Sequence, residues 1–299
     1  MASVTVFDTN VYQSTSPTRL EKIVASESRE GIQAYADSWV MIELIAKLRD
    51  PRERPRARSA LRKQLTHCGD EHPRMLIDCE EQICRFLLNV ASPGYAERRD
   101  HITSLVEYVA RAPDADDLSS VLPAVCEIAA NVDEIERERA TKVLDMIRRL
   151  VPGAESWDAI AKDPEIKDKA LTWIASDGAI RTLASAEVLK AYSSARLPRP
   201  APLPIEMVNA IVRHFRYPLE VELRVIRNVL EHGGALTGRG RQNSVWDAQI
   251  AFNAGQIVDK GRRITLVTDD RLLLDVARRT NTHSVQTSAE YLEHRGIAA

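Results

Sequence analysis

Four carboxylate side chains occupy positions at which a carboxylate is costly to bury. Asp8 directly follows the apolar stretch 4–7, and Asp270 comes three residues after the apolar stretch 264–267. Glu43 and Asp247 lie within helical patterns rich in apolar residues. A buried carboxylate needs hydrogen-bond donors or a cation beside it. Carboxylates that come close together repel one another, and an oxygen-only cluster suits Mg²⁺ or Mn²⁺.

Each of these acids also has an ordinary structural interpretation. Asp8, followed by Thr9 and Asn10, is typical of a strand that ends in an Asx-turn. Glu43 fits a solvated residue at the edge of an apolar helical stripe. The joint placement favours a site, because the C-terminal ends of parallel strands share one edge of a sheet, where ligands bind.

Short strands and amphipathic helices would position these acids. Ser38 and Ser244 are the expected N-caps of the two helices that carry Glu43 and Asp247, with Asp37 and Ser38 as a cap pair. The strand-forming residues, each followed by polar or turn residues, occupy 4–7, 31–36, 264–267 and 283–286. This order of elements predicts an α/β domain with a mostly parallel sheet.

Residues 51–204 lack a strand signal. They show helical periodicity over 76–90, 101–111, 118–150 and 166–192. A block of this length is large enough for a core of its own, and the alternating prolines up to Pro204 predict an extended connector at its end. We therefore predict a domain made of 1–50 plus 205–299, interrupted by a helical insertion over 51–204.

The composition describes a nearly neutral chain without an export or membrane signal. Its 299 residues carry a formal net charge of −2, which excludes a globally polycationic chain but not a local basic groove. No apolar run approaches the roughly 20 residues that span a bilayer, and the N-terminus lacks a signal-peptide pattern. The four cysteines form no C-x-x-C pair, which favours free thiols. We expect a cytoplasmic protein.

Two basic segments are candidates for contact with a polyanion. Arg239 and Arg241 lie in a glycine-containing loop just before Asp247, and we predict that they bind substrate phosphates. The arginine-rich run 49–63 follows the Glu43 helix. It either lines the entrance to the site or forms a solvated basic surface.

The order of these motifs resembles that of the PIN-domain nucleases. The resemblance covers residues 1–50 and 205–299, and it implies an α/β/α sandwich that cleaves RNA with Mg²⁺ or Mn²⁺. The residues that carry it are the Asp-Thr-Asn motif at Asp8, Ser38 five residues before Glu43, Asp247 on an Ala/Ile-rich helix, and the Thr-x-Asp motif from Thr268 to Asp270.

The resemblance also implies roles for individual residues. The catalytic acids and metal ligands would be Asp8, Glu43, Asp247 and Asp270. Asp270 is preferred because it occupies the Thr-x-Asp position, while Asp269 would be a further ligand or a charge at a helix N-terminus. The polar positions that orient ligands or solvent match Thr9, Asn10, Ser38 and Thr268. The implied reaction is metal-assisted hydrolysis of a phosphodiester bond.

The helical insertion departs from the family pattern, because small members have only a short helical pair at that place. It leaves the partners open: besides RNA, the candidates are an antitoxin or another protein bound through the insertion, and a second copy of the chain. Two other functions stay open, a non-catalytic PIN-like interaction module and a structure-specific DNA nuclease of the PIN-like class. The presence of all four acids favours the enzyme, because a scaffold has no need of a repulsive cluster.

Overall fold

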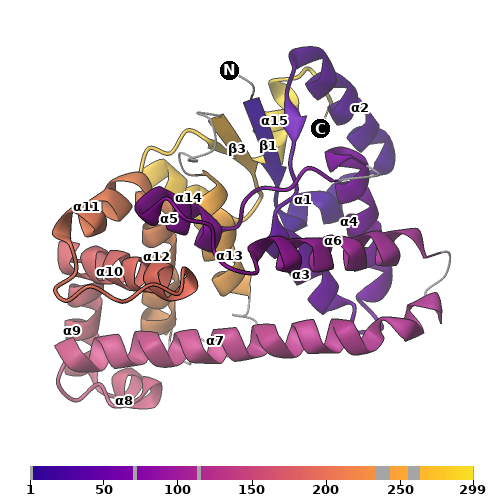
Figure 1. Ribbon diagram of the computed structural model, residues 1–299. Helices are drawn as coiled ribbons and strands as arrows, with labels where there is room; N and C mark the ends of the chain where they lie inside the picture. Colours follow the sequence, from indigo (N-terminus) through magenta and orange to yellow (C-terminus); the bar gives the residue numbers. More distant parts are fainter. Residues whose placement is uncertain (1–2, 70–72, 113–115, 233–242, 255–262, 299) are drawn as a thin grey trace.

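One small parallel sheet lies within a mostly helical molecule (Figure 1). The computed structural model describes residues 3–69, 73–112, 116–232, 243–254 and 263–298. The order of the strands is β2-β1-β3-β4, and every neighbouring pair is parallel. The strands are β1 (Ser3–Phe7), β2 (Gln33–Ala34), β3 (Arg263–Val267) and β4 (Val285–Gln286). The prediction of an α/β chain with a parallel sheet is confirmed at this level.

Strands β1 and β3 form the centre of the sheet. They pair along their whole length, from Ser3 opposite Arg263 to Phe7 opposite Val267. Their register brings the residues that follow them, Asp8 and Thr268, to the same edge of the sheet. The strand predicted over 31–36 is shorter than expected, because Ala36 pairs in an isolated bridge with Met75 instead of continuing along β1.

Helices occupy most of the remaining described residues. The first group is α1 (Thr9–Ser14), α2 (Pro17–Glu30), α3 (Ser38–Lys47), α4 (Arg54–Cys68), α5 (Cys79–Leu88), α6 (Tyr95–Arg111), the short 3-10 turn η1 (Asp116–Ser120) and α7 (Leu122–Leu150). The second group is α8 (Trp157–Lys162), α9 (Pro164–Ile174), α10 (Asp177–Ser194), α11 (Ile205–His214), α12 (Arg216–His232), α13 (Asn243–Ala251), the 3-10 turn η2 (Phe252–Ala254), α14 (Arg271–Arg279) and α15 (Ser288–Glu293). The helical periodicity over 166–192 corresponds to two helices, because Ser176 caps a new helix by accepting from the backbone N–H of Ala179.

A chain of buried polar groups ties β1 to four helices around it. Thr5 shares a hydrogen bond with Tyr291 (3.0 Å), and the Tyr291 hydroxyl donates to Glu27. The other oxygen of Glu27 lies 2.8 Å from His67 Nε2, and His67 Nδ1 lies 3.0 Å from the hydroxyl of Tyr12. These polar groups are buried and also hydrogen-bonded, so they fix the packing of the helices without being left unpaired.

Buried apolar side chains form two clusters. The first surrounds the sheet and includes residues of α1, α3, α4, α6 and the start of α7. The second lies among α5, α8, α9, α10, α11 and most of α12. The long helix α7 runs past both (Figure 1), with Val125 and Val132 in the first cluster and Val143 and Ile147 in the second.

The predicted division into 1–50 plus 205–299 and 51–204 stays a prediction, but the clusters divide the chain at other places. Helices α4 and α6, from the predicted insertion, pack with the sheet. Helix α11 and most of α12, from the predicted α/β domain, pack with the helical cluster. The insertion therefore shares its packing with the domain that it interrupts.

The cysteines are free, as predicted. Cys68, Cys79 and Cys84 are buried and Cys126 is exposed. Burial raises the pKa of the Cys68 thiol to about 12, so this thiol stays protonated and unreactive at neutral pH. None of the helices in the described ranges combines the length and apolarity that a membrane-spanning segment needs.

We expect the two clusters to unfold together, because α7 and α12 contribute to both. Leu219→Ala removes a fully buried side chain from the second cluster and should cost about 2–5 kcal/mol of unfolding free energy. Urea unfolding should be followed in two fluorescent variants, one that keeps Trp39 and Trp246 beside the first cluster and one that keeps Trp157 and Trp173 beside the second. Both should report the same lowered midpoint.

Leu197→Ala, at an exposed leucine, is the control and should leave the midpoint unchanged. Two separate midpoints, with only the second moved by Leu219→Ala, would contradict shared unfolding.

Candidate active site

Asp8 lies where β1 ends and α1 begins. Its backbone N–H donates to the carbonyl of Val267 on β3 (3.0 Å), and its side chain is 2% exposed. One carboxylate oxygen accepts from the backbone N–H of Thr9 (2.6 Å), and the other accepts from the hydroxyl of Thr268 (2.8 Å). Asp8 is therefore the N-cap of a helix and also a link between the two central strands.

Glu43 faces Asp8 from helix α3. Its carboxylate is buried and accepts from the hydroxyl of Thr9 (2.5 Å) and from Lys47 Nζ (2.7 Å). Thr9 thus connects the two acids, with its backbone on Asp8 and its side chain on Glu43. Lys47 one turn later supplies the positive charge that Glu43 needs inside the protein.

The predicted cap pair of α3 is confirmed for Asp37 and wrong for Ser38. Asp37, not Ser38, caps the helix by accepting from the backbone N–H of Val40 (2.9 Å). The side-chain amide of Asn253 donates to the other oxygen of Asp37. Ser38 is instead a buried residue of the first helical turn. Burial raises the pKa of Asp37 to about 6, and its hydrogen bonds to Val40 and Asn253 counteract that shift.

Asp270 and Asp269 have different surroundings. Asp270 caps α14 with one oxygen, which accepts from the backbone N–H groups of Leu272 (2.7 Å) and Leu273 (3.1 Å). Asp269 is exposed, and its two oxygens accept from the backbone N–H and the hydroxyl of Ser288 at the start of α15. The structure therefore turns Asp270 toward the other acids and engages Asp269 elsewhere.

Electrostatic coupling links Asp247 on α13 to the other three acids. Burial and then the charges of Asp270, Asp8 and Glu43 raise the pKa of Asp247 well above its ordinary value. Burial, followed by the charge of Glu43, raises the pKa of Asp8 to about 7, and Asp270 adds a smaller increase. The four predicted acids, Asp8, Glu43, Asp247 and Asp270, are thus close enough to repel one another. We call them the acid centre.

The acid centre suits a divalent cation by the type and charge of its donors, since it offers carboxylate oxygens with unrelieved repulsion. It is not a ready-made cage. Within the described ranges, no three His, Cys, Asp or Glu side chains are arranged to hold a metal ion. Both oxygens of Asp8 and of Glu43 already accept hydrogen bonds, but a carboxylate oxygen has a second lone pair to offer. The side chains must draw closer to share one ion.

Several predicted residues take other places. Asn10 is exposed on α1, and the side chain of Ser244 lies outside the described residues. Thr268 is fully buried and also accepts from the backbone N–H of Asp270 (3.0 Å), so it supports two of the acids. Arg239 and Arg241, predicted to bind phosphates, lie outside the described residues.

The arginine-rich run 49–63 proves to be largely structural. From Arg54 onward it forms the helix α4, and its long side chains satisfy backbone carbonyls. Arg58 donates to Val109, and Arg62 donates to the carbonyls of Ala110 (2.6 Å) and Ala112 (2.9 Å) at the end of α6. These contacts cap carbonyls that α6 leaves unpaired at its C-terminus. Neither of the two predicted roles, a lined entrance or a solvated surface, describes Arg58 and Arg62.

Three supporting residues were not predicted from the sequence. Lys47 stands four residues after Glu43, a helical spacing that would have suggested the pair. Tyr217 is buried beside the acid centre, and its hydroxyl donates to the carbonyl of Leu273 (3.2 Å). Asn253 donates to Asp37, and no local sequence pattern predicts this contact.

Comparisons of the chain with protein-family models, with curated proteins and with solved structures found no match. The resemblance to PIN-domain nucleases therefore stays a prediction from motifs. The function has to be argued from the acid centre itself.

Asp8→Asn should stabilise the metal-free protein more as the pH rises. Because the pKa of Asp8 is about 7 when folded and 3.8 unfolded, Asp8 favours folding below pH 4, and this contribution is lost as the pH rises through 7. The gain from Asp8→Asn should thus grow from pH 5 to pH 8, reaching up to about 4 kcal/mol. Urea unfolding in EDTA at four pH values measures it.

Asp269→Asn, which removes an exposed acid outside the acid centre, is the matched control and should keep the pH dependence of the parent protein. A gain from Asp8→Asn that shrinks toward high pH would mean that Asp8 is stabilised, not strained, as a carboxylate.

Proposed function

We propose that this chain is a metal-dependent nuclease of the PIN-like type that hydrolyses RNA. The observation that carries the proposal is the placement of four buried or half-buried acids after β1, on α3 and α13, and at the start of α14, with Thr9 bridging Asp8 to Glu43 and Thr268 bridging Asp8 to the backbone of Asp270. A structural protein gains nothing from such a cluster, because it lowers stability. In a site for divalent cations, the same negative charges attract an ion, and the bound ion removes the repulsion between them.

Individual residues have distinct parts in this proposal. Asp8, Asp247 and Asp270 would hold a Mg²⁺ or Mn²⁺ ion, with Glu43 at its side. When bound, the ion supplies a water of lowered pKa and neutralises charge on the phosphodiester. Thr268 and Thr9 hold the carboxylates of Asp8 and Glu43 in place.

Lys47 Nζ lies 2.7 Å from Glu43 and lines a cavity of about 220 Å³ beside the acid centre. Acidic side chains outnumber Lys47 and Arg49 around this cavity, so Lys47 balances the charge of Glu43 and does not form a phosphate site there. Trp246 lines the same cavity next to Asp247, and its ring packs edge-on against Trp39 with ring centroids 5.5 Å apart.

The finer parts of the proposal follow from the motif resemblance. The sheet and its helices would form the α/β/α sandwich of PIN-like nucleases. The helices from residues 51–204 would offer a surface for an antitoxin or another partner. The alternatives, a non-catalytic module and a DNA nuclease, are decided by the two experiments below.

We expect Mn²⁺-dependent cleavage of RNA that Asp8→Asn, Asp247→Asn and Asp270→Asn each reduce on the order of 10²-fold or more, the usual cost of removing a central electrostatic group. The assay incubates the full chain with labelled single-stranded RNA and with DNA of the same sequence, in Mn²⁺ or in EDTA. Asp269→Asn should keep its activity, because its carboxylate is bound to Ser288.

Cleavage of DNA but not of RNA would show that the substrate is DNA. Equal activity in EDTA and in Mn²⁺ would exclude the metal-dependent mechanism.

Metal binding can be measured without any substrate. We expect Mn²⁺ to raise the melting temperature of the parent protein at pH 8, with a gain of about 2.7 kcal/mol at 100 times the dissociation constant. The gain should be smaller at pH 5.5, where protons compete for Asp8 and Asp247. Isothermal titration calorimetry of the parent protein and of Asp8→Asn checks it, and heat-silent titrations of both would favour the interaction module.

A further inference from the structure

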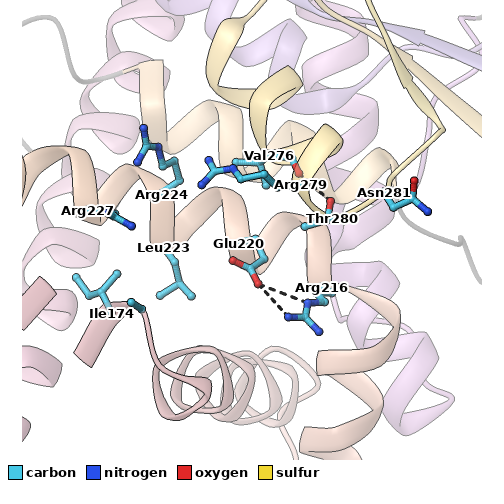
Figure 2. A pocket seen from close by; sticks show the side chains of 11 residues that line it. Ile174, Arg216, Glu220, Leu223, Arg224, Arg227, Val276, Arg279, Thr280 and Asn281 are labelled. Carbon is cyan, nitrogen blue, oxygen red and sulfur yellow. Dashed lines mark hydrogen bonds and ion pairs between the residues drawn. The ribbon is translucent and has the colours of Figure 1, made fainter. Parts of the chain in front are cut away.

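A second cavity, of about 390 Å³, lies between α12, α14 and the C-terminal end of α9 (Figure 2). Three of its arginines come from α12, and the fourth comes from α14. Between them lies an apolar floor that includes Leu223 and Val276. Figure 2 shows the ion pair of Arg216 and Glu220 on one side of Leu223. We call the cavity the arginine groove, and its arginines are Arg216, Arg224, Arg227 and Arg279.

The arginine groove carries more positive than negative charge. Glu220 pairs with Arg216 (3.4 Å), and Glu231 pairs with Arg227 (2.6 Å) and approaches Arg224 (4.0 Å). These two carboxylates face four guanidinium groups. Each guanidinium has five N–H donors, so the paired arginines keep donors for an added anion.

Arg279 adds a guanidinium without a carboxylate partner in the described ranges. Its Nε donates to the backbone carbonyl of Asp275 (3.3 Å), which orients the side chain and leaves its charge uncompensated. The side chain is exposed. An exposed, oriented guanidinium is suited to the two oxygens of a phosphate.

The arginine groove and the acid centre share the same two helices. Helix α14 begins at the cap Asp270 and ends at Arg279, a rise of about 14 Å. The residue after Arg216 is Tyr217, which is buried against the acid centre and bonded to Leu273 on α14. The two sites are therefore separated by about the length of α14, a span of a few nucleotides of a single strand.

We propose that the arginine groove binds the phosphates of single-stranded RNA a few nucleotides away from the bond that the acid centre cuts. This assignment of the substrate track depends on the proposed nuclease function. The acid centre repels a polyanion, so a strand held there needs positive charge close by. The guanidinium groups would hold the phosphates of the strand, a contact that does not depend on its base sequence.

The test measures RNA binding without catalysis. A fluorescent oligouridylate is titrated with the full chain carrying Asp8→Asn, in EDTA, and its anisotropy is followed at several salt concentrations. The groove variant adds Arg224→Glu and Arg279→Glu. The control variant adds Arg137→Glu on α7 and Arg278→Glu. Arg278 directly precedes Arg279 in the sequence but lines a different cavity. Both variants change the net charge equally.

We expect the groove variant to bind at least about tenfold more weakly and to flatten the plot of log K against log salt by about 1.4, as for two lost phosphate contacts. The control should keep both values near those of the parent. Arg224→Lys with Arg279→Lys should retain most of the binding, because it keeps the charge, and circular dichroism confirms that each variant is folded.

Equal weakening by groove and control variants would overturn the proposal, since only total charge would then matter. If the groove variant loses binding to polyglutamate but keeps binding to RNA, the arginine groove would instead be assigned to an acidic protein. The binding assay needs neither metal nor catalysis. If the parent protein does not cleave RNA but the groove variant still loses RNA binding, the nuclease proposal falls and the RNA-binding site stands.

Discussion

The buried carboxylate of Asp8 is the constraint on which the rest of the structure depends. Its two oxygens accept from Thr9, the next residue, and from Thr268, which is 260 residues away in the sequence. Burial is the largest cause of its raised pKa, and Glu43 adds to it. Because the ionised form is strained, the surrounding packing must hold Asp8 in place. The full-length pairing of β1 with β3 does so.

Carboxylates also cap three helices that leave this part of the fold. Asp8 caps α1, Asp37 caps α3, and Asp270 caps α14. Helices α1 and α14 thereby direct the positive ends of their dipoles toward Asp8 and Asp270, which offsets part of the repulsion between these acids. The same caps fix the directions in which the helices leave the sheet. Local capping chemistry and the charge of the site thus depend on the same carboxylates.

Local patterns predicted most of this arrangement. The strands that precede Asp8 and Thr268 were predicted because their β-branched residues and the polar residues after them form a short-range signal. The sequence left the cap of α3 open between Asp37 and Ser38, because both residue types can cap a helix, and the amide of Asn253 that supports Asp37 lies far away in the sequence. The apolar cluster that each helix joins also escaped prediction, because periodicity shows that a helix has an apolar face but not which core receives it.

The arginines show the same limit. A basic run predicts a basic surface, yet Arg58 and Arg62 reach the carbonyls at the end of α6, a contact that only the tertiary structure creates. Arg216, Arg224 and Arg227 follow one face of α12 at helical spacing, but Arg279 joins them only through the packing of α14 on α12. The positive charge available to a polyanion therefore depends on how many guanidinium donors the protein's own carbonyls and carboxylates leave unpaired. On α12 and α14, four guanidinium groups face two carboxylates, which leaves surplus positive charge near the acids that would otherwise repel the substrate.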